Sequence, residues 1–196
     1  VPVDTADEAA VRVGAGLVSI AADPGNVTAI ASGMPELMVH GLRDPARAIE
    51  LAARATVVAV GPGLGQTPWA NTVFDAALAS GRPLVIDADG LNILAQRGIK
   101  AHANCILTPH PGEAGRLLGV TTAEVQSDRL AALDKLVARF GCVVVLKGAG
   151  TLVGAPNLPA AFCERGNPGM AAPGMGDVLT GAIAGILAQN GECWPS

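Results

Sequence analysis

The strongest constraint on the fold of this chain is that short apolar runs alternate with stretches of helical pattern along its length. The apolar runs are LVSIAA from residue 17, TVVAV from 56, PLVIDAD from 83, CILTP from 105 and CVVVLK from 142. The predicted helices are residues 5–13, 45–55, 68–80 and 122–140, and the stretch after Met175. Strand, helix and strand in repetition are typical of βαβ units. The pattern therefore predicts an α/β fold, in which a doubly wound, mostly parallel sheet carries helices on both faces.

The residue composition agrees with a sheet that is buried on both sides. Half of the 196 residues are hydrophobic, aromatic residues make up only 3%, and tyrosine is absent. The core must therefore be built from branched and small side chains, which favours parallel strands covered by helices over an aromatic-rich sandwich. No linker, internal repeat or low-complexity tract divides the chain, so we expect residues 1–196 to form a single domain.

Charge and the length of the apolar runs exclude several classes of partner. Acidic residues outnumber basic residues, 17 to 13, so we expect neither a nucleic-acid partner nor an anionic membrane surface. The apolar runs are too short to span a bilayer, and the first ten residues are acidic where a signal peptide would be basic. The four cysteines form no Cys-x-x-Cys pair. We therefore expect a cytoplasmic protein with reduced thiols.

A polar or glycine-rich turn follows each of four predicted strands, and another precedes the last predicted helix. These turns are GPGLG (61–65), DADGLN (87–92), TPHPGE (108–113), KGAGT (147–151) and GMGD (174–177). In a doubly wound sheet, ligands bind at the carboxyl ends of the strands. The five turns therefore predict one long site at a single edge of the sheet.

Two of the turns, Gly61–Gly65 and Lys147–Thr151, are rich in glycine, which permits positive φ and lets phosphate oxygens approach backbone amides. Neither has a diagnostic order, because GPGLG is not G-x-G-x-x-G and KGAGT lacks the order of a Walker A loop. Each therefore predicts either a phosphate-binding loop or a tight turn. For KGAGT the second possibility is a β-hairpin turn with Lys147 simply solvated.

The turns TPHPGE and DADGLN supply carboxylates. Two prolines restrict the first, so that His110 and Glu113 are held, and Glu113 falls in the first turn of a helix, where it can bind magnesium through water. The alternatives are a favourable first-turn charge and a loop histidine without a task. Asp87 and Asp89 can orient a hydroxyl or a metal, a choice that the residues leave open, and for Asn92 we expect a structural role.

The turn GMGD combines backbone amides with a carboxylate. Gly174, Met175 and Gly176 can present amides at the positive end of the final helix, where a transferring phosphoryl group finds donors. Asp177 is placed to accept a proton from a hydroxyl beside that phosphate, as phosphorylation of a hydroxyl requires. The alternative is an ordinary helix N-cap. The glycine- and alanine-rich helix that follows predicts close packing.

These motifs resemble those of a known family. GMGD before a small-residue helix resembles the anion-hole and base motif of the ribokinase-like superfamily. The closer resemblance is to the ADP/ATP-dependent NAD(P)H-hydrate dehydratases. It is carried by RVGAGLV (12–18), PELMVH (35–40), VGPGLG (60–65), DADGLN, TPHPGE, LKGAGT (146–151) and GNPGM with GMGDVLTG (166–181). The motifs span nearly the whole chain in the expected order, and they imply a ribokinase-like fold.

The resemblance implies repair of a damaged cofactor. ADP or ATP phosphorylates the hydroxyl on the hydrated nicotinamide ring of NADHX or NADPHX, and loss of that phosphate restores NADH or NADPH. The resemblance makes Asp177 the base, with Gly174, Met175 and Gly176 as the anion hole. It assigns Lys147, Gly148, Ala149, Gly150, Thr151 and Gly176 to the adenine nucleotide. It assigns Gly63, Gly65, Asp89, His110 and Asp177 to the hydrated substrate, and Glu113 to Mg²⁺ through water.

The resemblance also implies further sequence beyond both ends of this chain, and partner domains. Members of the family normally begin with a glycine-rich strand upstream of residue 1, and they add helices beyond the final NGECWPS. We therefore expect residues 1–196 to belong to a larger, bifunctional polypeptide that is fused to, or paired with, an NAD(P)HX epimerase. A homo-oligomer is expected as well. Pro173 stands where a glycine is common, and proline has no amide hydrogen to donate.

Two other functions remain open. One is a ribokinase-like kinase of a small hydroxylated metabolite, of the hydroxymethylpyrimidine or thiazole type. The other is a non-catalytic nucleotide-binding module. A kinase leaves a stable phosphorylated product, whereas a dehydratase releases inorganic phosphate.

Overall fold

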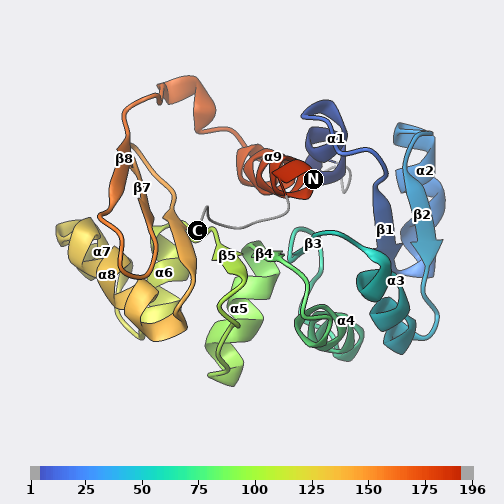
Figure 1. Ribbon diagram of the computed structural model, residues 1–196, viewed down its shortest axis with the longest axis horizontal. Coiled ribbons are helices and arrows are strands. Elements are labelled where there is room, and N and C mark those ends of the chain that lie inside the picture. The colour runs from blue at the N-terminus through green and yellow to red at the C-terminus, as the bar shows by residue number, and fades with distance from the viewer. Residues whose placement is uncertain (1–4, 191–196) are drawn as a thin grey trace.

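A six-stranded sheet forms the centre of the computed structural model, which describes residues 5–190 (Figure 1). Its strands follow one another in chain order: β3 (Val58–Val60), β4 (Leu84–Ile86), β5 (Cys105–Leu107), β6 (Val143–Leu146), β7 (Thr151–Gly154) and β8 (Ala161–Cys163). β3 to β6 are parallel, whereas β7 and β8 are antiparallel to their neighbours. The predicted mostly parallel sheet is confirmed.

Helices cover both faces of this sheet (Figure 1). The helices that connect the parallel strands lie on one face: α4 (Pro68–Ala79), α5 (Ala88–Arg97), α6 (Pro111–Leu118), α7 (Thr122–Ser127) and α8 (Arg129–Phe140). On the other face lie α9 (Met175–Asn190), which follows a 3₁₀ turn at Pro168–Met170, and α1 (Thr5–Arg12). The sheet is therefore buried on both sides, as predicted.

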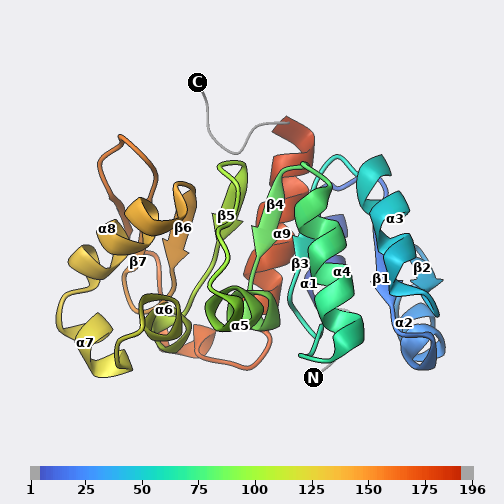
Figure 2. The same ribbon diagram turned by 90° about the horizontal axis from the view of Figure 1, so that it is seen from below.

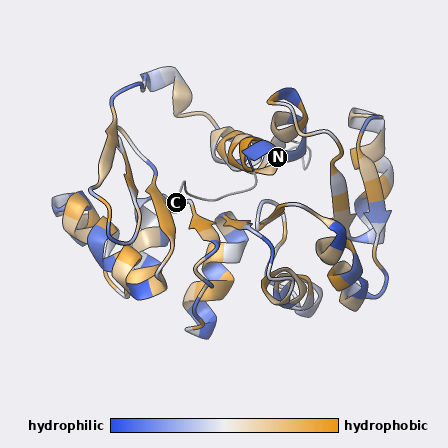
Figure 3. Ribbon diagram, viewed as in Figure 1, coloured by the Kyte–Doolittle hydropathy of each residue, from blue (hydrophilic) through white to orange (hydrophobic). Residues whose placement is uncertain are grey.

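The strands alternate between two apolar cores. Val144 and Leu146 of β6 belong to the larger core under the connecting helices, whereas Val143 and Val145 belong to a smaller core under α9. Successive side chains of a strand point to opposite faces, which is why a continuous apolar run fits this position. Figure 3 shows the apolar residues concentrated on the central strands and on α9.

A second, two-stranded parallel sheet lies beside the first (Figure 2). It pairs β1 (Ser19–Ala22) with β2 (Met38–Gly41), and the connection runs through a 3₁₀ turn (Pro24–Asn26) and α2 (Val27–Gly33). Another 3₁₀ turn (Pro45–Arg47) leads into α3 (Ala48–Arg54). The sequence correctly predicts a strand within LVSIAA, but within residues 5–190 this strand pairs only with β2 and not with the main sheet.

The single helix predicted over 122–140 is wrong, because two helices occupy this stretch. Asp128 leaves the helical region, with φ −149° and ψ 87°, and separates α7 from α8. Its side chain accepts a hydrogen bond from the Ala131 amide at 2.9 Å, so it is the N-cap of α8. The cap stabilises a fresh helix start at Arg129.

Close packing of the final helix is confirmed. A Cβ built on Gly181 would lie 1.8 Å from the Ala6 carbonyl oxygen, and one built on Gly185 would lie 2.8 Å from the Ala10 carbonyl oxygen. Only glycine at these positions lets α9 approach the backbone of α1 so closely. The small residues of α9 therefore serve its contact with α1.

The structure bears in part on the two expectations about membrane spans and about reduced cysteines. None of the helices between residues 5 and 190 is both long and apolar enough to cross a bilayer. Cys163 on β8 is exposed and forms no disulfide, and Cys193 lies outside the described residues.

Candidate active site

The predicted turns meet at one edge of the main sheet. Because β3 to β6 are parallel neighbours, the turns that follow them leave from the same edge. α9 begins there as well, since a Cβ on Gly176 would lie 3.3 Å from Lys147 Nζ and 3.7 Å from Asp87 Oδ2. The convergence of the turns after β4 and β6 with the start of α9 is confirmed.

A buried carboxylate, Asp87, organises this edge. Its side chain is only 1% exposed and accepts hydrogen bonds from Lys147 Nζ at 2.6 Å and from Thr180 Oγ1 at 2.8 Å. The Lys147 amide also donates to the Pro109 carbonyl oxygen at 2.9 Å, which ties the turn after β6 to the turn after β5. The alternative of a simply solvated Lys147 is wrong, because its ammonium group is held inside the site, although the β-hairpin from β6 to β7 does form.

His110 and Glu113 form a capping box at the start of α6. His110 Nδ1 accepts hydrogen bonds from the amides of Gly112 (3.0 Å) and Glu113 (3.3 Å), and Glu113 Oε2 accepts from the His110 amide at 2.8 Å. Glu113 is 5% exposed, and its burial raises the pKa of its carboxyl group above the usual value. His110 is therefore not a histidine without a task, because it caps a helix whether or not it also binds substrate.

The capping role predicts a pH-dependent stability. Burial, followed by the positive charges of Lys147 and Arg116, lowers the pKa of the His110 imidazole below its usual value. The unfolded state then binds the proton more tightly, so this contribution is fully present above about pH 6.5 and is lost as the pH falls through the folded-state pKa. Asparagine can still cap the helix but does not titrate in this range. We therefore expect the stability of His110→Asn to fall less than that of the wild type as the pH is lowered.

Urea unfolding at about pH 7.5 and about pH 5 measures the effect, which should not exceed about 1 kcal/mol, the size of a typical cap. His40→Asn is the control for removal of a histidine elsewhere. An unchanged decline in His110→Asn would contradict the capping account.

Asp177 is the third residue of α9 and is half-buried. Burial is the main cause that raises the pKa of its carboxyl group, and the negative charge of Asp87 adds to it, while Lys147 acts in the opposite direction. The alternative of an N-cap is wrong, because Gly174, with φ +88°, precedes the helix and its carbonyl accepts the first helical bond, from Val178. The carboxyl of Asp177 thus stands in the first turn, where helix amides lack helical acceptors.

Of the three amides predicted for the anion hole, that of Met175 donates to the Ala172 carbonyl oxygen at 3.3 Å. Gly176 is the member of this turn that lies against Lys147. An incoming anion at this point would meet the first turn of α9 and an ammonium group together.

The turn after β3 is joined to the turn after β4. The Gly65 amide donates to Asp89 Oδ2 at 2.9 Å, so two residues predicted for the substrate pocket contact each other. Gly61 has φ +130°, and a Cβ there would lie 1.8 Å from the Asp87 carbonyl oxygen, which explains the requirement for glycine. Asn92 has the structural role that we expected, because it accepts a hydrogen bond from Arg116 Nε at 2.8 Å.

From the sequence, the role of Asp87 stays open between a hydroxyl and a metal, and no role is predicted for Thr180 or Arg129. The structure assigns Asp87 to Lys147 and Thr180. Thr180 lies within the GMGDVLTG motif, but its partner and those of Arg129 are remote in sequence. Arg129 donates to four carbonyl groups of the segment 146–150.

The carboxylates of the site do not form a metal cage. In the part of the chain that the structure describes, no group of three or more His, Cys, Asp and Glu side chains could hold a metal ion. Lys147 Nζ stands between the two nearest carboxylates, 2.6 Å from Asp87 and 4.0 Å from Glu113. Mg²⁺ commonly keeps several waters and uses one or two carboxylates together with substrate phosphates. Glu113 therefore fits a magnesium ion held through water, and not one held by protein ligands alone.

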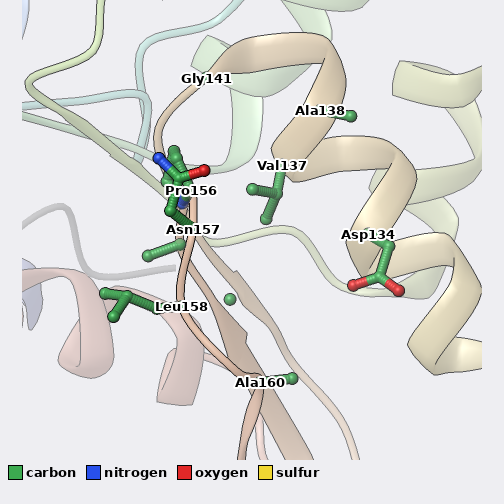
Figure 4. A pocket seen from close by; sticks show the side chains of 10 residues that line it. Asp134, Val137, Ala138, Gly141, Pro156, Asn157, Leu158 and Ala160 are labelled. Atoms are coloured by element: carbon green, nitrogen blue, oxygen red, sulfur yellow. The ribbon is translucent and has the colours of Figure 1, made fainter.

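A hollow of about 470 Å³ between α8 and the β7–β8 turn lies elsewhere (Figure 4). Its lining consists of Asp134, Val137, Ala138, Gly141, Gly154, Ala155, Pro156, Asn157, Leu158 and Ala160. Gly141 precedes β6 and Gly154 ends the antiparallel β7, so the hollow opens at the sheet edge opposite Lys147. It does not belong to the cluster of turns.

Residues 5–194 match the sequence profile of the family described as NAD(P)H-hydrate dehydratase. The chain belongs to this family. A bifunctional NAD(P)H-hydrate repair enzyme of Coxiella burnetii is 46% identical over 185 residues, which cover 94% of this chain and 38% of that protein. An ADP-dependent (S)-NAD(P)H-hydrate dehydratase of Neisseria meningitidis is 43% identical over 170 residues, which cover 83% of this chain and 56% of that protein.

Solved structures agree with the family. The ADP/ATP-dependent NAD(P)H-hydrate dehydratase of Bacillus subtilis, co-crystallised with ATP and Mg²⁺, is 30% identical and superposes with a TM-score of 0.77 over 94% of this chain and 66% of its own. A ribokinase-like superfamily protein of Enterococcus faecalis is also 30% identical, with a TM-score of 0.86 over 96% of this chain and 66% of its own. The dehydratase fold of this chain is therefore ribokinase-like, as the motifs implied.

The kinase alternative gains no support from these relatives. A hydroxyethylthiazole kinase of Pyrococcus horikoshii shares 18% identity at a TM-score of 0.62, which shows the common fold alone. The chain spans 38% of the length of the Coxiella enzyme and 56% of the length of the Neisseria enzyme.

Proposed function

We propose that this chain is the catalytic part of a nucleotide-dependent NAD(P)H-hydrate dehydratase. The substrate is NADHX or NADPHX, and ADP or ATP is the phosphate donor. The observation that carries the proposal is the meeting of Lys147, Gly176 and Asp177 at the start of α9, because it places a cation, a helix amino terminus and a carboxylate with raised pKa side by side. This is what phosphorylation of a hydroxyl requires.

Asp177 is the general base of the proposed reaction. Its carboxylate takes the proton of the ring hydroxyl while that oxygen attacks the terminal phosphorus of the nucleotide. The raised pKa brings the proton affinity of Asp177 closer to working pH, which favours general-base catalysis. Gly174, Met175 and Gly176 surround the transferring phosphoryl group, and ADP or AMP leaves as the hydroxyl oxygen bonds to phosphorus. Cleavage of the bond between the ring carbon and the phosphate oxygen then releases inorganic phosphate, and loss of a proton from the neighbouring ring carbon forms the double bond of the reduced nicotinamide.

The remaining residues bind the two ligands. Lys147 to Thr151 hold the phosphates and ribose of the adenine nucleotide, and Gly63, Gly65, Asp89 and His110 line the pocket for the hydrated dinucleotide. Glu113 would hold Mg²⁺ through water, and the ion would neutralise phosphate charge. The ATP and Mg²⁺ of the Bacillus subtilis crystals support this use of nucleotide and metal.

The bifunctional relatives support a fused partner domain. Several curated relatives are named bifunctional repair enzymes, among them that of Escherichia coli, which is 47% identical over 93% of this chain. We therefore propose that an NAD(P)HX epimerase is fused to this domain or acts beside it. A cytoplasmic location follows from the proposed substrates, which derive from intracellular cofactors. We further propose that the protein forms a homo-oligomer.

The decisive experiment mixes the complete protein with NADHX or NADPHX and either ADP or ATP. Recovery of reduced-nicotinamide absorbance with release of one inorganic phosphate per cofactor is the expected result, and the four combinations identify donor and substrate. A stable phosphorylated product would indicate a kinase instead. Nucleotide binding without any turnover would indicate a non-catalytic module.

A further inference from the structure

Arg129 contacts the loop of residues 147–151 from the first position of α8. Its Nη1 donates to the carbonyl oxygens of Ala149 (2.6 Å) and Gly150 (2.9 Å). Its Nη2 donates to those of Leu146 (3.1 Å) and Lys147 (3.3 Å). One planar guanidinium group therefore holds four peptide carbonyls of a loop whose glycines give it little stiffness of its own.

This contact fixes the direction of the loop amides. In a trans peptide the carbonyl and the following N–H point in opposite directions. The Leu146 carbonyl faces Arg129, and the next amide, that of Lys147, points away and donates to Pro109. By the same geometry the amides of Gly148 and Gly150 point away from Arg129.

Those two amides have no hydrogen-bond acceptor among residues 5–190. The carbonyls beside them are occupied, whereas the donors are not, which is the arrangement of a backbone nest for an anion. Gly148 (φ +149°) and Gly150 (φ +67°) both adopt conformations that favour glycine. A Cβ on Gly148 would also lie 3.0 Å from Arg129 Nη2, so glycine and arginine fit each other here.

The helix break at Asp128 gives Arg129 its place. Asp128 caps α8 and thereby makes Arg129 the first residue of the helix, beside the β6–β7 turn. A continuous helix over 122–140 would carry the side chain in another direction. The Asp128 cap therefore helps to place the Arg129 side chain that holds the loop.

We propose that Arg129 is a positioning residue for the nucleotide: by holding four carbonyls it aims the Gly148 and Gly150 amides at the nucleotide phosphates. The proposal rests on the proposed function of the loop. Lysine has the same charge but a single nitrogen with three donors, so it cannot span four carbonyls. The arrangement, and not the charge, is what the loop needs.

The test compares Arg129→Lys and Arg129→Gln with the wild type in the complete protein. We expect each variant to raise the KM for ADP or ATP and the Kd for the nucleotide about tenfold, the size expected from losing one or two hydrogen bonds. The KM for NADHX should stay within about twofold, because the loop does not contact that substrate. Exchange of the Lys147 amide hydrogen, which is bonded to the Pro109 carbonyl oxygen in the wild type, should become faster when the loop is no longer held.

Arg139→Lys is the matched control, because Arg139 is an exposed arginine at the other end of the same helix. It should leave both KM values unchanged. Thermal unfolding shows that each variant is folded, and Kd is measured on the folded protein. An unchanged nucleotide Kd in either folded variant would overturn the proposal, as would equal losses for both substrates. A wild-type protein that recovers no NADH would instead contradict the proposed function.

Discussion

Asp177→Asn should lower kcat for cofactor recovery by about 10²–10⁴-fold, the usual contribution of a general base. Asparagine keeps the shape of the side chain in the first turn of α9 but cannot accept the proton of the ring hydroxyl. The KM values should change little, because the ligand contacts remain. The pH profile should change as well. In the wild type, kcat falls as the pH falls through the raised pKa of Asp177, and the variant should lack this acid limb.

Steady-state kinetics of the complete protein over a pH series measure both effects. Asp134→Asn, an exposed aspartate on α8, is the control for the same change of side chain. A variant that kept its kcat, or that retained the acid limb, would show that Asp177 is not the base.

Lys147→Met should lower the free energy of unfolding by about 3–5 kcal/mol, the loss typical when one partner of a buried ion pair is removed. Asp87 is 1% exposed, and its charge would then be opposed by no cation of residues 5–190 at hydrogen-bond distance. Methionine has a similar length, so the loss reflects the stranded carboxylate more than a cavity. Nucleotide binding should fail in the same variant, since the ammonium group faces the start of α9.

The double variant Asp87→Asn/Lys147→Met separates these causes. It contains no stranded charge, and Thr180 can still donate to the amide oxygen that replaces the carboxylate at position 87, so most of the stability should return. Nucleotide binding should stay lost. Urea unfolding gives the free energies, with Lys135→Met as the exposed control. Additive losses in the double variant would contradict the account of a stranded charge.

The edge of the sheet that carries the site could be predicted, because each buried strand ends in glycine or a polar residue and parallel strands end together. The capping roles were not predicted: histidine is not among the usual N-cap residues, and Asp128 lies inside a stretch whose pattern predicts one continuous helix. The contact between Asp87 and Lys147 could not be predicted, because 60 residues separate them and only the register of β4 and β6 brings them together. The contacts of Arg129 depend on the path of the hairpin in the same way.

The separation of the β1–β2 pair from the main sheet predicts regions with different local stability. The pair rests on a small core of Ile20, Ala22, Ile30 and Leu37, whereas β4 to β6 lie inside the large one. Contiguous elements open as cooperative units, and units with few buried contacts open first. We therefore expect amide hydrogens of β1 and β2 to exchange with solvent through a partial opening, and those of β4 to β6 only when the whole fold opens. Asp87, Lys147 and Asp177 lie outside the β1–β2 pair, so we expect the candidate site to stay folded during this partial opening.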